Sequence, residues 1–450
     1  MTARSGSQST QQSSESLHRI RSHNGYGIDE EQPRRSRVAP SYSQEKDPYE
    51  VGWDDGANDP LCPWSFKKVK KWVIVSILCA GSFTVTNISS GYTSTYEQME
   101  AEFGNSRIVS VLGLSLFVLG IAFGPMLFGP LSEFYGRRPI YLVAWVVFVL
   151  FLFPGAFGTN IQTILVARFF GGFSGSAFLA VSGGAVGDLF QRHELQAPMV
   201  LFSLAPFLGP TAGPLIGGFI NYNVDWRWTY YVFLVWTGVL LVAVVFFVPE
   251  TYHPILLRNK ARGLRKRTGD DRWLAPTEKT QRSVIRAIGL SLLRPMQLLV
   301  FEPMCLNLCL LSAMLLGILY LFFGAFALVF STNYGFNLWQ IGMTFIPICV
   351  GMFIASATDP LIVLVYTGIF TFLVDAYPTY AASALAANAF VRCLFATAFP
   401  LFGNQMYHKL GFQWASTLLA FLLLAMMPFP FIFFRYGKQI RKKSRYATTA

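Results

Sequence analysis

The sequence predicts an all-α membrane protein whose helices cross the bilayer many times. Only 13% of its 450 residues are charged and 53% are hydrophobic, whereas a soluble globular chain carries about 25% charged residues. The apolar residues gather in runs of about 20, which is the length that one membrane-spanning helix needs. These runs are continuous and do not alternate with period two, so they predict helices and not the strands of a membrane β-barrel.

We place about eleven candidate spans along the chain. Six precede a long basic segment, at residues 72–92, 108–131, 139–157, 161–187, 198–220 and 230–248. Five follow it, at residues 302–329, 341–357, 361–374, 380–402 and 414–434. The expected domains are a six-helix bundle at 71–248, a basic linker at 249–300 and a second helix bundle at 301–435.

The charge distribution orients the chain in the membrane. Lysine and arginine strongly outnumber acidic residues between Pro249 and Pro295, and basic loops of this kind stay in the cytoplasm. The six preceding spans then place the amino terminus in the cytoplasm as well. Residues 1–70 are polar, lack the apolar core of a cleavable signal peptide, and are expected to form a disordered cytoplasmic tail. Residues 436–450 are expected to form a second cytoplasmic tail.

The number of spans conflicts with the charge of the carboxyl end. Five spans after a cytoplasmic linker would place residues 436–450 outside the cell, although their basic charge favours the cytoplasm. Two explanations remain open on these observations. Either residues 341–374 form one tilted or broken helix, which gives ten spans, or about one span with its loops is absent near residues 358–361.

A glycine-rich basic motif lies between the second and third spans. Its glycines allow a tight turn and a close helix approach. Glu133 and Arg137 are four residues apart, so they are able to pair with each other or to reach neighbouring helices. The simpler alternative is a basic cytoplasmic turn with no further role. The candidate site residues of this motif are Gly129, Glu133, Gly136, Arg137 and Arg138.

Arg168 lies within the fourth span. An arginine in hydrocarbon costs about 2.5 kcal/mol or more, so we expect it to face a cavity or a polar partner. The alternative is an arginine that reaches the membrane interface, because the position lies within about two turns of the start of the span.

Three further polar residues are candidates for the cavity. Asn87 belongs to a polar side of the first span and is expected either to line a cavity or to bond a neighbouring helix. Asn388 and Arg392 share a helix face, where they could line the cavity or pair with Glu133. Glu302 and Asp375 lie near span ends and are favoured as packing partners over proton carriers.

The fifth span has glycine at every fourth position. Gly209, Gly213 and Gly217 leave one helix face without side chains, which lets another helix pack closely. Pro210 and Pro214 are expected to kink this helix. Gly218 extends the motif. An ordinary membrane packing face is the simpler alternative.

Three segments, in this order along the chain, resemble the signature motifs of the major facilitator superfamily. They are the basic motif after the second span, the region around Arg168 and the glycine motif of the fifth span. More narrowly, they are similar to the fungal branch of the twelve-span drug:proton antiporters. The chain departs from that pattern at Val200, where the family has glycine, and at Glu133, where many relatives have aspartate. The resemblance covers residues 59–445 and includes the runs at 188–190, 225–228, 249–252, 375–378 and 381–384.

The resemblance implies two bundles of six helices, both chain ends in the cytoplasm, and a ninth span that is missing near residues 358–361. It also implies proton-coupled export of a small organic molecule such as a drug, toxin or secondary metabolite. The basic motif would form a cytoplasmic gate, Arg168 would support coupling, and the glycine helix would bend or seal during exchange. Localisation in the plasma membrane is expected, with the vacuole as the alternative.

Other function classes are kept as alternatives or set aside. A polyamine or nutrient carrier shares the fold, and a non-transporting membrane protein, inactive through loss of one span, is a rival of another class. We expect no enzyme, because no catalytic constellation or phosphate-binding loop is visible. The six cysteines fit small apolar positions, and none has a metal spacing. The expected partners are substrate, protons and the bilayer, with no cofactor, metal or nucleic acid, and the chain is expected to be monomeric.

Overall fold

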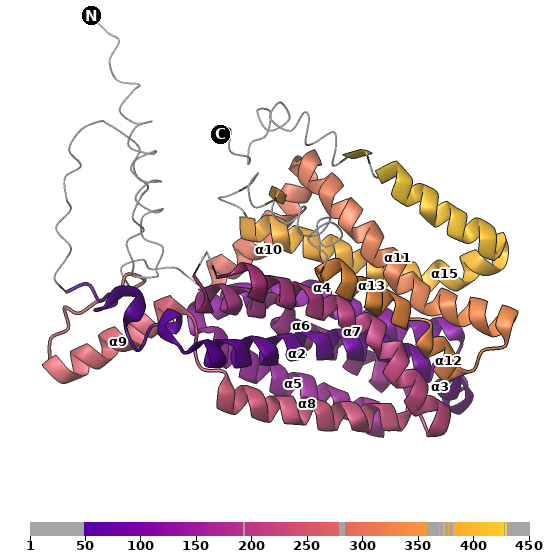
Figure 1. The fold of residues 1–450 in the computed structure, drawn as a ribbon, viewed down its shortest axis with the longest axis horizontal. Helices are drawn as coiled ribbons and strands as arrows, with labels where there is room; N and C mark the ends of the chain where they lie inside the picture. The colour runs from indigo at the N-terminus through magenta and orange to yellow at the C-terminus, as the bar shows by residue number, and fades with distance from the viewer. Residues whose placement is uncertain are drawn as a thin grey trace, which may run out of the picture.

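The computed structural model is built from helices, and it describes residues 49–191, 194–278, 284–357, 369, 372, 373, 377, 381–426, 428 and 429. Within these ranges, nine helices are long and apolar enough to cross a membrane. An all-helical membrane fold is thereby confirmed. The helices run along one long direction, with an indigo-to-magenta layer beneath an orange-to-yellow layer (Figure 1).

The first bundle contains one helix for each predicted span. α2 packs on α7, α4 packs on α6, and α5 packs on both α6 and α8. Short segments η3 (Tyr92–Thr95) and α3 (Tyr96–Phe103) follow α2. The six long helices are α2 (Lys68–Gly91), α4 (Arg107–Tyr135), α5 (Arg137–Phe157), α6 (Ile161–Leu189), α7 (Gln196–Asn223) and α8 (Arg227–Phe247).

In the second bundle, the helices are divided and joined at other residues than the sequence predicts. The span expected at 341–357 is divided into α12 (Leu338–Met343) and α13 (Ile346–Ala357). Two spans share α15 (Ala381–Met426), whose backbone breaks at Gly411 with a φ of 77°. α11 (Pro303–Tyr334) contains the span expected at 302–329. Most of the span expected at 361–374, and the tail at 436–450, lie outside the described residues.

The structure bears on two expectations for the cytoplasmic segments, of which the extent of the disordered amino-terminal tail is wrong in part. α10 (Val284–Phe301) is itself long and apolar enough to span a membrane, although we placed it in the basic linker. Arg286 and Arg294 lie within this helix, and for that reason the sequence groups it with the basic linker. The tail expected to be disordered up to residue 70 is folded from residue 49 onward, because Val51, Trp53 and Cys62 are buried against α9 (His253–Thr268). Residues 1–48 lie outside the described residues.

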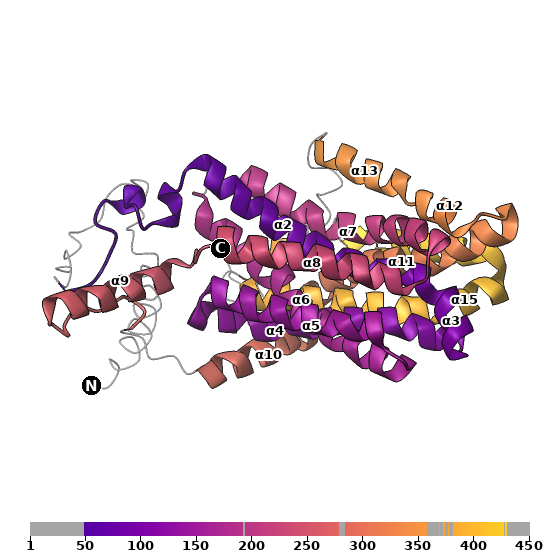
Figure 2. The ribbon, with the colours of Figure 1, turned by 90° about the horizontal axis from the view of Figure 1, so that it is seen from below.

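The two bundles meet at the end opposite to α9 and also further along the helices, where the ring centres of Phe123 on α4 and Phe390 on α15 lie 5.4 Å apart. α9 projects from one end of the helices, and α12 lies at the other end (Figures 1 and 2). We call these the cytoplasmic and extracellular ends, following the charge of the linker. α7 packs against α12, and α4 packs against α15, where the Ser115 hydroxyl donates to the Thr397 carbonyl at 2.7 Å. The contacts between the bundles thus include the extracellular end.

The glycine face of α7 packs directly on α2. A Cβ atom on Gly213 would lie 2.6 Å from the Gly91 nitrogen, and one on Gly209 would lie 2.6 Å from the Phe83 oxygen. These approaches are too short for any side chain, so glycine is required at both positions. The close packing expected from the sequence therefore has α2 as its partner.

We predict that Gly213→Ala lowers the stability of the protein by about 1–3 kcal/mol, because the added methyl group overpacks the α2–α7 contact. The change is measured as a fall in the melting temperature of purified protein in detergent. Gly238→Ala is the matched control, since nothing lies within 4 Å of a Cβ at that position of α8. Equal melting temperatures for the two variants would contradict the assignment of the glycine face.

Candidate functional site

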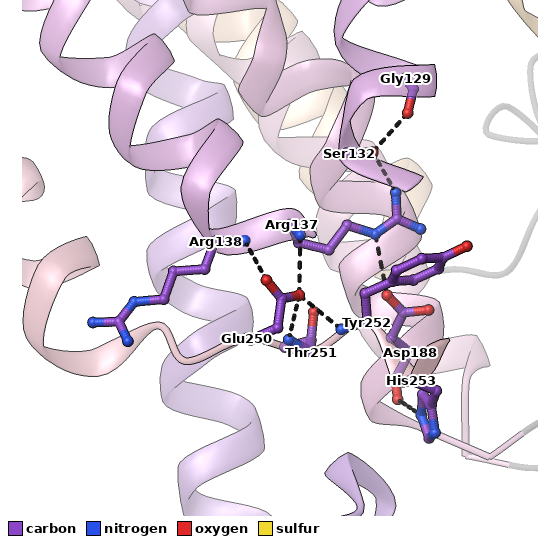
Figure 3. Close-up of polar contacts among 9 residues, drawn as sticks. All are labelled: Gly129, Ser132, Arg137, Arg138, Asp188, Glu250, Thr251, Tyr252 and His253. Carbon is purple, nitrogen blue, oxygen red and sulfur yellow. Dashed lines mark hydrogen bonds and ion pairs between the residues drawn. The ribbon is translucent and has the colours of Figure 1, made fainter. Parts of the chain in front are cut away.

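The basic motif forms a tight turn between α4 and α5. Gly136 adopts a φ of 100°, which favours glycine, and its amide donates to the Ser132 carbonyl at 3.1 Å. The Ser132 hydroxyl donates to the Gly129 carbonyl and accepts from Arg137 Nη1, each at 2.7 Å (Figure 3). The turn therefore aims the Arg137 side chain back along the end of α4.

Of the two alternatives that the sequence left open for Arg137, it reaches a neighbouring helix and binds an aspartate at the end of α6, and it does not pair with Glu133. Its Nε lies 3.2 Å from the Asp188 carboxylate, and both side chains are largely buried. Its guanidinium also lies 4.7 Å from the centre of the Tyr252 ring. Glu133 is exposed and forms no hydrogen bond or ion pair with any residue in the described ranges. The i,i+4 pairing is thus wrong, since the helix ends before Arg137 and the turn redirects the side chain.

Glu250 closes the turn from the end of α8. Its carboxylate accepts hydrogen bonds from the backbone amides of Arg137 at 3.0 Å and Arg138 at 3.1 Å. It also accepts from the amides of Thr251 at 3.0 Å and Tyr252 at 2.9 Å (Figure 3). The first amides of a helix lack partners within it and attract negative charge. Glu250 therefore caps α5, a role that our site prediction missed although the run at 249–252 was noted.

The partners named so far in this network belong to the first bundle and its linker. Arg138 adds a bond from Nη2 to the Val245 carbonyl at 2.9 Å, which ties α5 to α8. The ends of α4, α5, α6 and α8 are consequently joined to one another. A gate between the two bundles stays a prediction, whereas the geometry describes a brace within one bundle. We call Ser132, Arg137, Arg138, Asp188 and Glu250 the cytoplasmic brace.

Arg168 is buried and satisfied by backbone carbonyl groups. Only 4% of the residue is exposed, so the alternative that it reaches the interface is wrong. Its guanidinium lies between the rings of Tyr92 and Phe117, 4.3 Å from each centre. Its three nitrogens donate to the carbonyls of Gly113 at 3.2 Å, Ile88 at 3.1 Å and Ser89 at 3.0 Å. Arg168 therefore holds α2, α4 and α6 together.

The other candidate cavity residues are placed in different surroundings. Asn87 is 1% exposed, and neither atom of its amide has a partner within the part of the chain that the structure describes. Ser89, two residues further on, is the one that faces the second bundle, with its hydroxyl 3.4 Å from that of Tyr320. Asn388 accepts a hydrogen bond from Ser312 and does not pair with Glu133. Arg392 lies 5.9 Å from the centre of the Phe207 ring on α7.

The glycine motif of α7 has a second face toward the second bundle. A Cβ on Gly218 would lie 2.8 Å from the Leu338 carbonyl of α12. Likewise, a Cβ on Gly342 would lie 2.7 Å from the Pro214 carbonyl. Gly217 belongs to the other face, where a Cβ would lie 2.8 Å from the Gly91 carbonyl. α7 is therefore packed on α2 along one side and on the second bundle along another.

We predict that Asp188→Asn destabilises the protein by about 3 kcal/mol, because it leaves the largely buried Arg137 without its counter-charge. The change is measured as the shift in the denaturation midpoint in detergent. Glu133→Gln is the control and should change stability by less than about 0.5 kcal/mol, as expected for an exposed side chain. A larger loss in Glu133→Gln than in Asp188→Asn would restore the pairing expected from the sequence.

The fold resembles solved transporter structures. The human organic anion transporter MFSD10 (TETRAN) aligns with a TM-score of 0.58 at 16% identity, covering 80% of this chain and 99% of that chain. A peptide transporter POT in complex with sulfate aligns with a TM-score of 0.55 at 11% identity, covering 83% of this chain and 96% of that chain. At these identities the likeness concerns the fold alone.

Fungal relatives match along most of the chain. "Efflux pump atB" of Aspergillus terreus is 42% identical over 460 positions, covering 87% of this chain and 89% of that protein. "Probable drug/proton antiporter YHK8" of Saccharomyces cerevisiae is 35% identical over 467 positions, covering 89% of this chain and 91% of that protein. The multidrug transporter mdrA of Aspergillus fumigatus is 35% identical, covering 90% of this chain and 76% of that protein.

These alignments are longer than the matched part of this chain. For the Aspergillus terreus protein, 87% of 450 residues is about 392 residues, so about 68 of the 460 aligned positions have no residue here. For the yeast protein, 89% of 450 is about 400 residues, which leaves about 67 of 467 positions without a residue. Both relatives therefore contain one or more internal segments that this chain lacks.

The sequence profile of one protein family covers most of the helical region. It matches residues 75–362, which include most of the first bundle, from the second turn of α2 onward, and the start of the second bundle. Together with the matched fungal relatives, this profile shows that the chain belongs to the Major Facilitator Superfamily.

Proposed function

We propose that this protein is a proton-coupled exporter of a small organic molecule. The observation that carries the proposal is the near full-length similarity to fungal proteins named as an efflux pump and as a probable drug/proton antiporter. The proposed cargo is a drug, a toxin or a secondary metabolite. The plasma membrane is the proposed location, and a monomer is the proposed working unit.

The geometry supports movement of one bundle against the other. The cytoplasmic brace joins the ends of four helices of the first bundle, and Arg168 joins α2, α4 and α6 deeper in that bundle. Transporters of this fold expose a central site to each side of the membrane in turn. A braced first bundle is suited to such rigid-body motion, with α7 as the closely packed contact to the second bundle.

The polar residues between the bundles are suited to a role in the transport path. Ser89 and Tyr320 face each other across the interface. Arg392 approaches α7 from the second bundle. We propose that these residues, with Asn388, lie along the substrate path, and that Arg168 maintains the helix spacing on which coupling depends. A carrier of polyamines or nutrients stays an alternative within the same fold.

We predict that cells producing the active protein retain less of at least one toxic compound in a broad panel than cells without it. A protonophore should abolish the difference, because export against a gradient would draw on the proton gradient. The measurement is the retained amount of each compound over time. Equal retention for every compound would contradict the export proposal.

Arg168→Lys is the variant that links this activity to the structure. A lysine has one ammonium group and cannot reproduce the fork of donors that spans three carbonyls, so the rate of export should fall about tenfold or more. Arg272→Lys is the matched control, because Arg272 is exposed in the linker and pairs with Asp270. Both variants should reach the membrane in wild-type amounts.

We also propose that most of the missing segment belongs between residues 358 and 361. The family profile ends at residue 362, next to this junction. A gap of about 67 positions is long enough for one span of about 20 residues with its loops. Restoring such a segment would also place the basic carboxyl tail in the cytoplasm.

We predict that the transcript contains additional in-frame codons between Thr358 and Leu361 in the form that transports. Sequencing the transcript across these codons tests this directly. The longer form should export, and the 450-residue form should export more slowly or not at all. A transcript that reads straight through, together with full export by the 450-residue chain, would contradict the proposal.

A further inference from the structure

The segment before the first span wraps around the linker helix α9. We call residues 49–66 the strap. The Val51 amide donates to the Leu274 carbonyl and the Leu274 amide donates to the Tyr49 carbonyl, each at 3.0 Å. Val51, Trp53 and Cys62 of the strap are buried with Leu257 and Ala261 of α9. α9 is therefore enclosed between the strap and the chain that follows it.

A partly buried lysine of α9 binds the strap through hydrogen bonds and ion pairs. Lys260 Nζ donates to the Gly52 carbonyl at 3.0 Å and to the carboxylates of Asp54 at 2.8 Å and Asp59 at 3.1 Å. Asp59 also accepts from the Leu61 amide at 2.9 Å, which fixes the turn of the strap. The side chain of Lys260 is only 12% exposed, so these bonds are partly shielded from water. The strap is thus attached at a specific place on α9.

His253 connects the strap to the cytoplasmic brace. Its ring is fully buried, with its centre 5.8 Å from that of Trp53 and 5.1 Å from that of Trp64. Its Nε2 lies 2.9 Å from the Asp188 carbonyl oxygen. Because a carbonyl only accepts hydrogen bonds, Nε2 carries the proton and donates it. Burial lowers the pKa of His253 to about 4, so the ring is neutral at cytoplasmic pH.

Asp188 is held from both sides. Its backbone carbonyl accepts from His253, while its carboxylate binds Arg137. Asp188 is fully buried at the end of α6. A shift of this helix end would move the carboxylate away from Arg137, and small displacements of a buried pair are costly. The strap, through His253, therefore acts on the geometry of the brace.

We propose that the strap is a positioning element of the transport cycle, with His253 as the residue that transmits its effect to Asp188. Trp53 and Trp64 exclude water from His253, which keeps its ring neutral. They also pack the ring against the end of α6. With the strap detached, water competes for the Asp188 carbonyl and the end of α6 loosens. The brace then no longer holds the first bundle as one body. This inference rests on the proposed export function.

The first part of the test measures attachment of the strap without any transport assay. Cys62 is fully buried within the strap, and burial also raises the pKa of its thiol. A membrane-impermeant maleimide added to the cytoplasmic face of inside-out vesicles should therefore label Cys62 slowly. In His253→Ala the labelling rate should rise about tenfold, which corresponds to a loss of about 1.4 kcal/mol in local stability. The label is located by mass spectrometry of the peptide.

A matched control uses a tryptophan away from the strap. Trp414 is 71% exposed and lies in α15, so Trp414→Ala should label at the wild-type rate. Trp64→Leu removes part of the packing on the His253 ring and leaves its Nε2 in place. This variant should also raise the rate at which Cys62 is labelled. This variant replaces His253→Ala in the test if the latter does not accumulate in the membrane. Labelling at the wild-type rate in both His253→Ala and Trp64→Leu would overturn the attachment.

The second part of the test measures export of a compound that the wild type has been found to export. His253→Ala should lower the maximal rate about tenfold with little change in KM, because positioning is lost and substrate contacts are not. His253→Gln retains a side-chain N–H donor and should recover at least half of the lost rate. A merely structural role would give reduced protein amounts with a normal rate per molecule.

Two outcomes separate this inference from the proposed function. If the wild type exports a compound and His253→Ala exports it at the same rate while Cys62 labels faster, the strap has no role in transport and the inference is overturned. If the wild type exports nothing from the panel, the proposed function fails, and the positioning role falls with it.

Discussion

The buried ion pair between Arg137 and Asp188 is the contact on which the cytoplasmic end of the first bundle depends. The pair joins the start of α5 to the end of α6 at 3.2 Å. Removing one charge of such a pair would leave the other buried without compensation. Glu250 adds the end of α8, since its carboxylate takes up amides that α5 cannot satisfy itself. Four helix ends are joined by only a few side chains.

This arrangement places rigidity and movement in different parts of the molecule. Within the first bundle, Arg168 bonds to carbonyls of α2 and α4, and the brace secures the cytoplasmic ends. Between the bundles, the contacts are glycine-to-backbone approaches of α7, a few hydroxyl bonds, and apolar packing that includes the ring pair of Phe123 and Phe390. Packed interfaces tend to switch between discrete arrangements. The interface of α7 with the second bundle is therefore the natural place for the movement that transport requires.

The spans and the motifs could be predicted from the sequence because both depend on local patterns. Apolar runs located the six helices of the first bundle, and the glycine period located the close face of α7. The partners of those motifs could not be predicted, because Asp188 and Glu250 lie 51 and 113 residues from Arg137. Only the folded chain brings them together, and an i,i+4 rule suggested Glu133 instead.

Composition misled the prediction where a few apolar residues decide the structure. The strap is polar on average, yet Val51, Trp53 and Cys62 are enough to bury it against α9. α10 contains two arginines among its apolar residues, and these arginines placed it in the predicted basic linker. For Asn87 the sequence left cavity lining and bonding to a neighbouring helix open, and it gave no sign that the hydroxyl of Ser89 would meet that of Tyr320. The gates, the coupling role of Arg168 and the junction near residue 358 stay predictions.

The most direct measurement of the central claim is a pair of spin-label distances in nanodiscs, taken with the native cysteines replaced. One pair lies within the first bundle, at the exposed positions Glu133 and Phe246, and the other links Glu133 to the exposed Phe353 of the second bundle. When pH or a transported compound shifts the conformation, the distance within the bundle should stay constant while the distance between bundles changes. An equal change in both distances would contradict a braced first bundle that moves as one body.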